Sequence, residues 1–338
     1  MNAPAEFDVD VAHIRNHYDR LSFWYRTLWG EHIHHGYWED DESIARAQIQ
    51  LMERLAEKAA IPRAASVLDI GCGLGGSAFW LAKQYSCRVT GLTISPVQAR
   101  MAKKKAKAIG LSDQVQFQVA DVNLWQPRPG SIDVIWIMEG SEHFRDQKGF
   151  FGRCAYALNP GGILAICAWL RGDRPFRRED KELITTIGRA MLSASLNTLS
   201  EYKAWMRDAG LNVETAQDIT QKVAPTWDYC SRLAECLPLR CLLPFVDSSS
   251  RRFVRSFPLM KRAYAEGVMA FGLFVARKSA TTKPAPSHIL ASIENLDIKL
   301  GYSVDVRIRQ SNSLSAVRGP AIEGLLIGGI PQRLSDGE

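Results

Sequence analysis

The stretch VLDIGCGLGGSAFW, from Val67 to Trp80, joins an apolar run to glycines at positions 71, 73, 75 and 76. An apolar run that ends at glycines and leads into helical spacing is typical of a buried strand, a tight turn and the following helix. Glycines at such a turn let a ligand approach the backbone closely. A dinucleotide-binding enzyme would place Asp or Glu at the end of the next strand, and here GLTIS places Thr93 there. The stretch therefore predicts a nucleotide-like ligand and argues against NAD.

The segments around this turn alternate between strand and helix patterns. Ser95 and Pro96 are typical of a helix start, and Gly110 after a lysine-rich turn is typical of a helix end. Strands that alternate with helices indicate a parallel sheet with helices on both faces, so we expect a doubly wound, Rossmann-like α/β domain. The expected strands are Ser66–Ile70, Arg88–Ile94, Val115–Val119, Ile132–Ile137 and Ile163–Leu170, and the other expected helices are Leu74–Tyr85 and Phe150–Leu158.

The alternation breaks after Leu170, where we expect a helical insertion before the last strands. From Ser279 the linker-like SATTKPAPS leads into a tail without sustained periodicity, which we expect to be poorly ordered or loosely packed. The expected segments are a charged, irregular stretch (Arg171–Lys181), a capped helix (Thr198–Gly210), a strand (Asn212–Thr220), a mostly helical region (Pro225–Tyr264) and a last strand (Gly267–Arg277).

Composition limits the classes of protein that the chain can belong to. Its 338 residues, 46% apolar with nine tryptophans, are enough for a globular protein. The acidic N-terminus and the lack of an 18-residue apolar run predict a cytoplasmic protein without membrane insertion. Seven cysteines without a C-x-x-C pair indicate reduced thiols. The net charge of +6 is mild, and the run RMAKKKAK falls on a predicted helix, so no nucleic-acid partner is expected.

Several motifs together resemble one known family. The runs LDIGCGLGG, VTGLTISPVQ, VADVNLW, WIMEGSEHF and LNPGGIL resemble the class I methyltransferases that use S-adenosylmethionine. Within that class the chain is similar to the tocopherol methyltransferase branch, which is related to cyclopropane fatty acid synthases. The resemblance runs from Asn16 to Lys278 and implies a seven-stranded sheet. It implies a methyltransferase domain over residues 1–278: an N-terminal helical lid (1–60), a cofactor-binding core (61–170), an acceptor-side insertion with the sixth strand (171–266) and the last strand (267–278), followed by the tail (279–338).

The resemblance also implies a set of cofactor-binding residues. Thr93 and Gln98 would meet the ribose, and Asp121 with Val122 would flank the adenine. Asp69 would either bind the amino group of the cofactor through water or only orient the loop. The others are Gly71, Cys72 and Gly73 at the methionine moiety, with Tyr18 and His34 at the edge of the site and Trp125 packing beside the adenine.

Three titratable residues follow the predicted fourth strand, where class I methyltransferases bring substrate and cofactor together. They are Glu139, Glu142 and His143. A histidine can exchange protons near neutral pH, so His143 is the first candidate base and Glu139 its rival. Alternatively, Glu139 only hydrogen-bonds a loop and His143 is a core residue. By the resemblance, Glu142 corresponds to the glutamate that cyclopropane synthases use near their carbocation.

The N-terminal segment His13–Trp38 is rich in histidine and aromatic residues. Its histidines at positions 17, 32, 34 and 35 could suggest a metal, but no carboxylate or cysteine completes a ligand spacing, so no metal is predicted. In the resembling families this segment closes over the cofactor, which would exclude water from a sulfonium. The alternative is a plain amphipathic helix that buries its aromatic residues.

These observations predict an S-adenosylmethionine-dependent enzyme, a monomer or homodimer, that methylates a small, fairly apolar acceptor. A phenol, an activated aromatic or isoprenoid carbon, and an amine all remain open, in secondary or in quinone and tocopherol-like metabolism. The alternatives are a lipid methyltransferase of the cyclopropane-synthase type, a non-catalytic cofactor-binding module and an NAD oxidoreductase.

Overall fold

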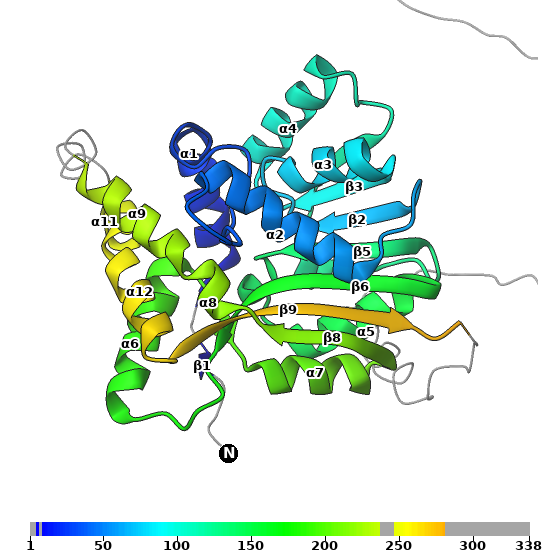
Figure 1. Cartoon of the computed structure of the whole chain (residues 1–338). Helices are drawn as coiled ribbons and strands as arrows, with labels where there is room; N and C mark the ends of the chain where they lie inside the picture. The colour runs from blue at the N-terminus through cyan, green and yellow to red at the C-terminus, as the bar shows by residue number, and fades with distance from the viewer. Residues whose placement is uncertain (1–4, 7–8, 237–246, 281–338) are drawn as a thin grey trace, which may run out of the picture. The chain divides into compact units, whose positions relative to one another are not determined.

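A seven-stranded sheet forms the centre of the fold. The computed structural model describes residues 5–6, 9–236 and 247–280, and the strand order of the sheet is β4-β3-β2-β5-β6-β9-β8 (Figure 1). The strands β2 to β6 run parallel, whereas β9 is antiparallel to both β6 and β8. The bounds are β2 (Ser66–Ile70), β3 (Arg88–Thr93), β4 (Val115–Val119), β5 (Ile132–Met138), β6 (Leu158–Arg171), β8 (Leu211–Asp218) and β9 (Met269–Lys278). A short ladder pairs β1 (Ala5–Glu6) with β7 (Ser195–Leu196).

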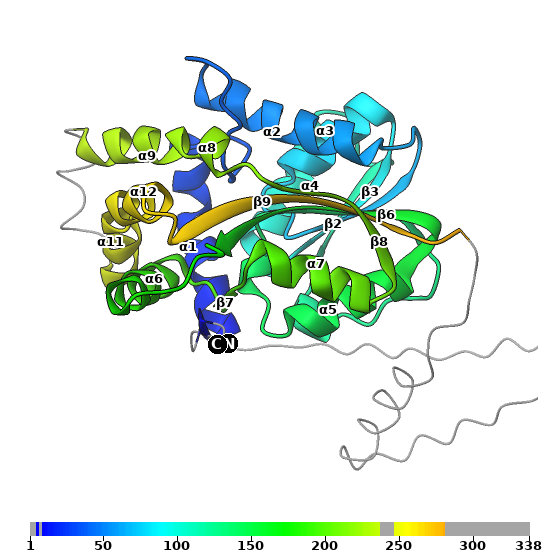
Figure 2. The same cartoon turned by 60° about the horizontal axis from the view of Figure 1, so that its bottom comes forward.

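Helices cover both faces of the sheet, which confirms the doubly wound fold class (Figure 2). Side chains alternate between the faces along each strand, so Val134 and Trp136 join one buried cluster while Ile135 joins the other. The first cluster includes residues of α2 (Ile44–Ala59), α3 (Gly76–Tyr85) and α4 (Pro96–Ala108), and the second includes residues of α5 (Gln147–Ala157) and α7 (Leu199–Asp208).

The N-terminal sixty residues divide into two parts with different positions. In α2, Leu51, Met52 and Leu55 are fully buried, and the helix contacts β6 and β9, so α2 belongs to the helix layer of the sheet. By contrast, α1 (Val11–Leu28) contacts α4 and lies beside the carboxyl ends of the parallel strands (Figure 1).

Two helix starts follow directly from local side chains. Ser95 accepts a hydrogen bond from the Gln98 N–H at 3.0 Å and caps α4 as expected. The helix α5 begins at Gln147 rather than at Phe150, because the Asp146 side chain accepts from the Gly149 N–H at 2.8 Å and caps an earlier turn.

The helix α6 (Arg178–Met191) lies within the expected helical insertion, but it was not predicted as a separate helix. Its first turn lies in the charged stretch Arg171–Lys181, which we expected to be irregular. The buried Asp180 accepts hydrogen bonds from the Arg174 guanidinium and from the Arg177 N–H, and this ordering starts the helix. The helix then buries Leu183, Ile184 and Ile187. The charged residues obscure the amphipathic periodicity of this segment in the sequence. The helix is stabilised by packing of its apolar face against the rest of the protein.

The expected helical insertion comes in two parts. The helix α6 precedes β8, and the remaining helices lie between β8 and β9, where they gather beside α1 at one end of the sheet (Figure 2). These helices are α8 (Thr220–Val223), α9 (Pro225–Glu235), α11 (Ser248–Arg255) and α12 (Phe257–Ala265). No helix in the described ranges has both the length and the apolar character needed to cross a membrane. The predicted tail lies outside the described residues, except for its first two positions.

Candidate active site

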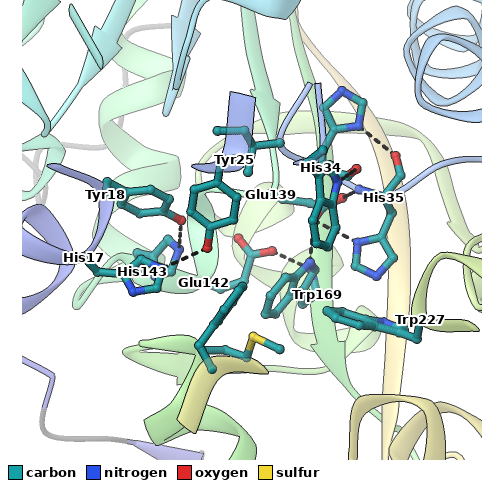
Figure 3. A pocket seen from close by; sticks show the side chains of 14 residues that line it. His17, Tyr18, Tyr25, His34, His35, Glu139, Glu142, His143, Trp169 and Trp227 are labelled. Atoms are coloured by element: carbon teal, nitrogen blue, oxygen red, sulfur yellow. Dashed lines mark hydrogen bonds and ion pairs between the residues drawn. The ribbon is translucent and has the colours of Figure 1, made fainter. Parts of the chain in front are cut away.

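An aromatic cavity lies between α1, the chain that follows it, and the ends of β5 and β6 (Figure 3). Its aromatic lining comes from segments far apart in the sequence: Tyr18, Tyr25, Trp29, Trp169, Trp227 and Phe253. Its polar lining consists of His17, His34, His35, Glu139, Glu142 and His143. The cavity therefore combines an aromatic lining with six polar, titratable side chains, three from α1 and the chain after it and three from the segment that follows β5.

A second cavity, the sheet-edge cavity, lies at the carboxyl ends of β2, β3 and β4. Six predicted cofactor-binding residues line it: Tyr18, Gly71, Thr93, Gln98, Asp121 and Val122. The Thr93 hydroxyl donates to Gln98 Oε1 at 2.8 Å, and Asp121 Oδ1 accepts from the Asn123 N–H at 2.9 Å. These polar groups lie where the doubly wound fold binds its ligands.

A third cavity, the glycine cavity, lies at the turn after β2. Asp69, Gly71 and Cys72 line it together with His32 and His34 of the N-terminal segment. Three of these side chains bury a polar atom that has no hydrogen-bond partner among the described residues: Asp69 Oδ2, His32 Nδ1 and His34 Nε2. Burial raises the pKa of Asp69 to about 7 and lowers that of His32 to about 3. Buried polar atoms without hydrogen-bond partners in the lining of one cavity indicate a place for a polar ligand.

One predicted cofactor-binding residue, Gly73, lies outside these cavities, as does Trp125, which we expected to be a packing residue rather than a specific contact. Gly73 lines none of the three, and a Cβ added to it would meet nothing within 4 Å. Trp125 packs against the second core cluster, with its ring centroid 6.5 Å from that of Phe150. The role of Gly73 at the cofactor stays a prediction.

The three cavities meet at a junction. Tyr18, Ile33, Glu139 and His143 line both the aromatic and the sheet-edge cavity, and Ile33 lines the glycine cavity as well. A ligand that extends from the glycine cavity into the sheet-edge cavity would thus touch a ligand in the aromatic cavity at this junction.

Glu139 is held by hydrogen bonds to both of its carboxylate oxygens. Oε1 accepts from the His35 N–H at 2.6 Å, and Oε2 accepts from His35 Nδ1 at 2.9 Å and from Trp169 Nε1 at 2.7 Å (Figure 3). Burial alone raises the pKa of Glu139, but the interactions with His35 outweigh burial, and the net pKa lies below the ordinary value. A carboxylate with both oxygens occupied is a weak candidate for a base, so the geometry favours the alternative in which Glu139 holds the loop.

Glu142, three residues after Glu139, has a hydrogen-bond partner for only one of its two carboxyl oxygens among the described residues. Oε1 accepts from the Trp169 backbone N–H at 2.7 Å, whereas Oε2 is buried and has no partner among the described residues. Burial raises the pKa of Glu142 to about 8, so this carboxyl group carries a proton at neutral pH. It can donate a hydrogen bond to a ligand in the aromatic cavity, or accept a proton after losing its own.

The raised pKa of Glu142 predicts a pH dependence of stability. Between its ordinary pKa of 4.5 and about 8 the folded protein holds a proton on Glu142 that the unfolded chain releases. The contribution of Glu142 to the free energy of unfolding therefore falls as pH rises through this window, with a slope of up to about 1.4 kcal/mol per pH unit. Glu142→Gln should reduce that slope in ligand-free denaturant titrations at pH 5 to 8. Asp69, whose pKa is also raised, keeps part of the slope in both proteins. Four histidines with lowered pKa values contribute with the opposite sign below their ordinary pKa of 6.5, equally in both proteins: His17, His32, His34 and His143. Equal slopes would contradict the buried, protonated state of Glu142.

His143 is oriented by its two ring nitrogens. Nδ1 lies 2.8 Å from the Leu192 carbonyl oxygen, which only accepts, so Nδ1 carries the proton and Nε2 is the basic nitrogen. The Tyr18 hydroxyl lies 3.2 Å from Nε2 and can donate to it. Burial lowers the pKa of His143, which keeps the ring neutral. His143 therefore has an unprotonated nitrogen that can act as a base, but this nitrogen is hydrogen-bonded to the Tyr18 hydroxyl, which also lines the junction.

Several lining residues were not identified as site residues from the sequence. Ile33 stands between histidines without a motif of its own, and His35 was considered only as a possible metal ligand and as part of the HHG stretch at the edge of the site. Trp169 and Trp227 lie far from the glycine turn in the sequence, and no local pattern marks them. In the described ranges, no group of three or more His, Cys, Asp or Glu side chains is arranged to hold a metal ion; the absence of a metal stays a prediction.

The parallel sheet with an antiparallel strand near one edge, and cavities at the glycine turn, define the class I methyltransferases, whose methyl donor is S-adenosylmethionine. The cyclopropane synthase MmaA2 from Mycobacterium tuberculosis shares this fold with a TM-score of 0.72, at 18% identity, over 80% of this chain and 99% of that one. The chain belongs to the mycolic acid cyclopropane synthetase family, whose model matches residues 6–237.

Curated relatives agree with the expected tocopherol methyltransferase branch. The chain is 33% identical over 284 residues to the "Probable tocopherol O-methyltransferase, chloroplastic" of Oryza sativa subsp. japonica, with 79% of this chain and 78% of the relative covered. It is 34% identical over 212 residues to the 27-O-demethylrifamycin SV methyltransferase of Amycolatopsis mediterranei (strain S699), with 62% of this chain and 77% of the relative covered. These comparisons confirm the predicted resemblance, and the chain is a methyltransferase.

Proposed function

We propose that this enzyme transfers the methyl group of S-adenosylmethionine to a small, fairly apolar acceptor that carries a hydroxyl group or an activated carbon. The observation that carries the proposal is the junction, where the aromatic cavity meets the sheet-edge cavity at Tyr18, Glu139 and His143 and where Ile33 also lines the glycine cavity. The relatives named for tocopherol and for demethylrifamycin support an acceptor of this kind.

The sheet-edge cavity and the glycine cavity fit the methyl donor. S-adenosylmethionine has an amino and a carboxylate group at one end. Asp69 Oδ2 and His34 Nε2 are unpartnered atoms that would accept hydrogen bonds from the amino group, because His34 Nδ1 donates to the His35 carbonyl oxygen and leaves Nε2 without a proton. Thr93 and Gln98 would hold the ribose, and Asp121 with Val122 would hold the adenine. The bound donor supplies a methyl group activated by a positively charged sulfur.

The protein's own residues would position the acceptor, exclude water and move one proton. Orientation of the reactants can supply about 7–11 kcal/mol of a barrier. For a phenol, we propose that the acceptor gives its proton to the Tyr18 hydroxyl while Tyr18 passes its own proton to His143 Nε2. Protonated Glu142 would hydrogen-bond the acceptor from the other side. A tertiary amine would need no such transfer.

A binding panel followed by a transfer assay tests the proposal. S-adenosylmethionine and S-adenosylhomocysteine should raise the melting temperature, whereas NAD and NADP should not; a ligand at 100 times its dissociation constant stabilises by about 2.7 kcal/mol. Deuterium-labelled methyl donor would then be offered with a phenol, a prenylated hydroquinone, an isoprenoid and an amine, and the products weighed by mass spectrometry. Stabilisation by NAD alone would sink the proposal, and binding without any turnover would favour a non-catalytic module.

A lipid methyltransferase of the cyclopropane-synthase type is the second candidate. The buried, unpartnered oxygen of Glu142 in the aromatic cavity favours it, together with the family of the chain. Vesicles of unsaturated phospholipid in the same assay distinguish the two candidates. Label in the acyl chains would support the lipid reaction, and label only in the phenol or hydroquinone would exclude it.

We also propose that residues 1–278 form the complete methyltransferase domain, with 171–266 on the acceptor side and 279–338 as a tail. The strand β9, which ends at Lys278 and pairs with both β6 and β8, supports this boundary. A chain that ends at Lys278 should stay in solution and bind S-adenosylmethionine within about twofold of the full chain, measured by calorimetry. Aggregation of the shortened chain would place part of the tail against the core.

We further propose a cytoplasmic enzyme that acts as a monomer or homodimer without nucleic acid. The six cysteines in the described ranges are free thiols, five of them buried, which suits a reducing compartment. The rice relative is named chloroplastic, so location is best tested by fractionation of the source cells. Light scattering would give the oligomeric state.

A further inference from the structure

We propose that the Glu139 carboxylate is a fixed negative charge that makes the site prefer the cationic S-adenosylmethionine over its neutral product, S-adenosylhomocysteine. The inference rests on the proposed cofactor. It concerns a selectivity that the fold alone does not provide, because donor and product share the adenine, ribose and amino-acid groups and differ at the sulfur.

Glu139 lies at the junction of the cavities, where the methyl group would be transferred. A methyl group can reach an acceptor only if the sulfur lies where the cofactor cavities meet the aromatic cavity. Glu139 lines both the aromatic and the sheet-edge cavity, and its side chain is only 5% exposed. Its backbone has φ of 55°, in the left-handed region that a glutamate rarely adopts. Backbone strain of this kind persists only where the surrounding structure fixes the residue, and it is found most often at active sites and ligand-binding sites.

The partners of Glu139 keep it charged. Three N–H groups of His35 and Trp169 point at its two oxygens, and donors of this kind favour the ionised form. The Tyr264 hydroxyl lies 3.3 Å from His35 Nε2 and can donate to it. In this proposal His35 carries a single proton, at Nδ1, which it donates to Glu139 Oε2 while Nε2 accepts from Tyr264, so that the carboxylate is hydrogen-bonded without being neutralised by a cation.

No other group in the described lining cancels this charge. None of the described residues that line the three cavities is Lys or Arg. The other carboxyl groups each line one cavity only, so none of them is part of the junction. Glu142 and Asp69 have raised pKa values, which favour their neutral forms. Asp121 accepts a hydrogen bond from Asn123, and Glu31 forms an ion pair with Lys105. Buried in a site of low polarity, the Glu139 charge attracts a sulfonium more strongly than it would in water. Loss of the methyl group removes that attraction, which would speed release of the product.

Calorimetry with three ligands tests the inference without any acceptor. The ligands are S-adenosylmethionine, S-adenosylhomocysteine and sinefungin, which carries an ammonium group in place of the sulfonium methyl. Glu139→Gln should weaken both cationic ligands by about tenfold, which corresponds to about 1.4 kcal/mol, and leave the neutral ligand within about twofold. Trp169→Phe is the matched control, because it removes one hydrogen-bond donor to Glu139 Oε2 but keeps the charge of the carboxylate. In this variant the ratio of the affinity for S-adenosylmethionine to that for S-adenosylhomocysteine should stay within about twofold of the ratio in the original protein.

The outcomes separate this inference from the proposed function. If none of the three ligands binds the original protein, the proposed cofactor is wrong. If all three bind and Glu139→Gln weakens them equally, or not at all, the charge has no selective role. If Glu139→Gln does not fold, the affinities of the original protein test the inference. S-adenosylmethionine and sinefungin must then bind more tightly than S-adenosylhomocysteine, and equal or tighter binding of S-adenosylhomocysteine overturns the inference.

Discussion

Replacing Gly71 by valine is expected to abolish S-adenosylmethionine binding, with a loss of affinity of at least about 100-fold, while the fold is kept. Gly71 has φ of 76°, where a side chain costs about 1–2 kcal/mol. A Cβ there would lie 3.5 Å from the Gly140 Cα, so the protein itself leaves room for it. The remaining methyl groups would occupy the sheet-edge and glycine cavities, both of which Gly71 lines. Calorimetry with S-adenosylmethionine measures the loss.

Gly110→Val is the matched control for backbone strain. Gly110 has φ of 69°, an added Cβ meets nothing within 4 Å, and the residue follows α4 outside the three cavities. Both variants should lose a similar amount of thermal stability, but only Gly71→Val should lose the ligand. If Gly71→Val binds S-adenosylmethionine normally, the glycine turn is not part of the cofactor site.

His143→Ala is expected to lower turnover by about 10²–10⁴-fold, the usual contribution of a general base, while cofactor affinity changes by less than about threefold. The basic Nε2 of His143 reaches the junction through the Tyr18 hydroxyl. Tyr18→Phe should therefore lower turnover to a similar extent, because it removes the proton path and leaves the imidazole. The rates are measured with the acceptor found in the transfer assay, alongside melting temperature and cofactor affinity.

The pattern of variants identifies the base or excludes one. A His143→Ala variant with normal turnover and a lower melting temperature would show a core histidine. Loss of activity in Glu142→Gln alone would assign proton transfer to that carboxyl group instead. Normal turnover in all three variants would mean that the acceptor needs no base, which favours an amine nitrogen. Glu139→Gln is not informative for this question, since both oxygens of Glu139 are engaged by His35 and Trp169.

Local sequence patterns were sufficient for the first part of the sheet. The strands β2 and β4 have the bounds expected for Ser66–Ile70 and Val115–Val119, and Ser95 caps α4 as expected. These features depend on side-chain periodicity, glycine and caps, which act between residues close in the sequence. The cofactor residues expected from the family resemblance lie mostly at the strand ends that these signals predict, and six of the expected residues, including Tyr18 of α1 and Gln98 of α4, line one cavity.

Only the tertiary structure decided the direction of β9, the existence of α6 and the state of each titratable group. Glu139 and Glu142 are three residues apart and chemically alike, yet the pKa of Glu139 is lowered and that of Glu142 is raised to about 8. His35 and the Trp169 indole supply the N–H groups to Glu139, whereas Glu142 receives one backbone N–H and buries its other oxygen. The sequence determined that carboxyl groups follow the fourth strand of the parallel sheet. Their charges depend on partners brought from other segments of the chain, because protonation responds to burial and to neighbouring donors rather than to position in the sequence.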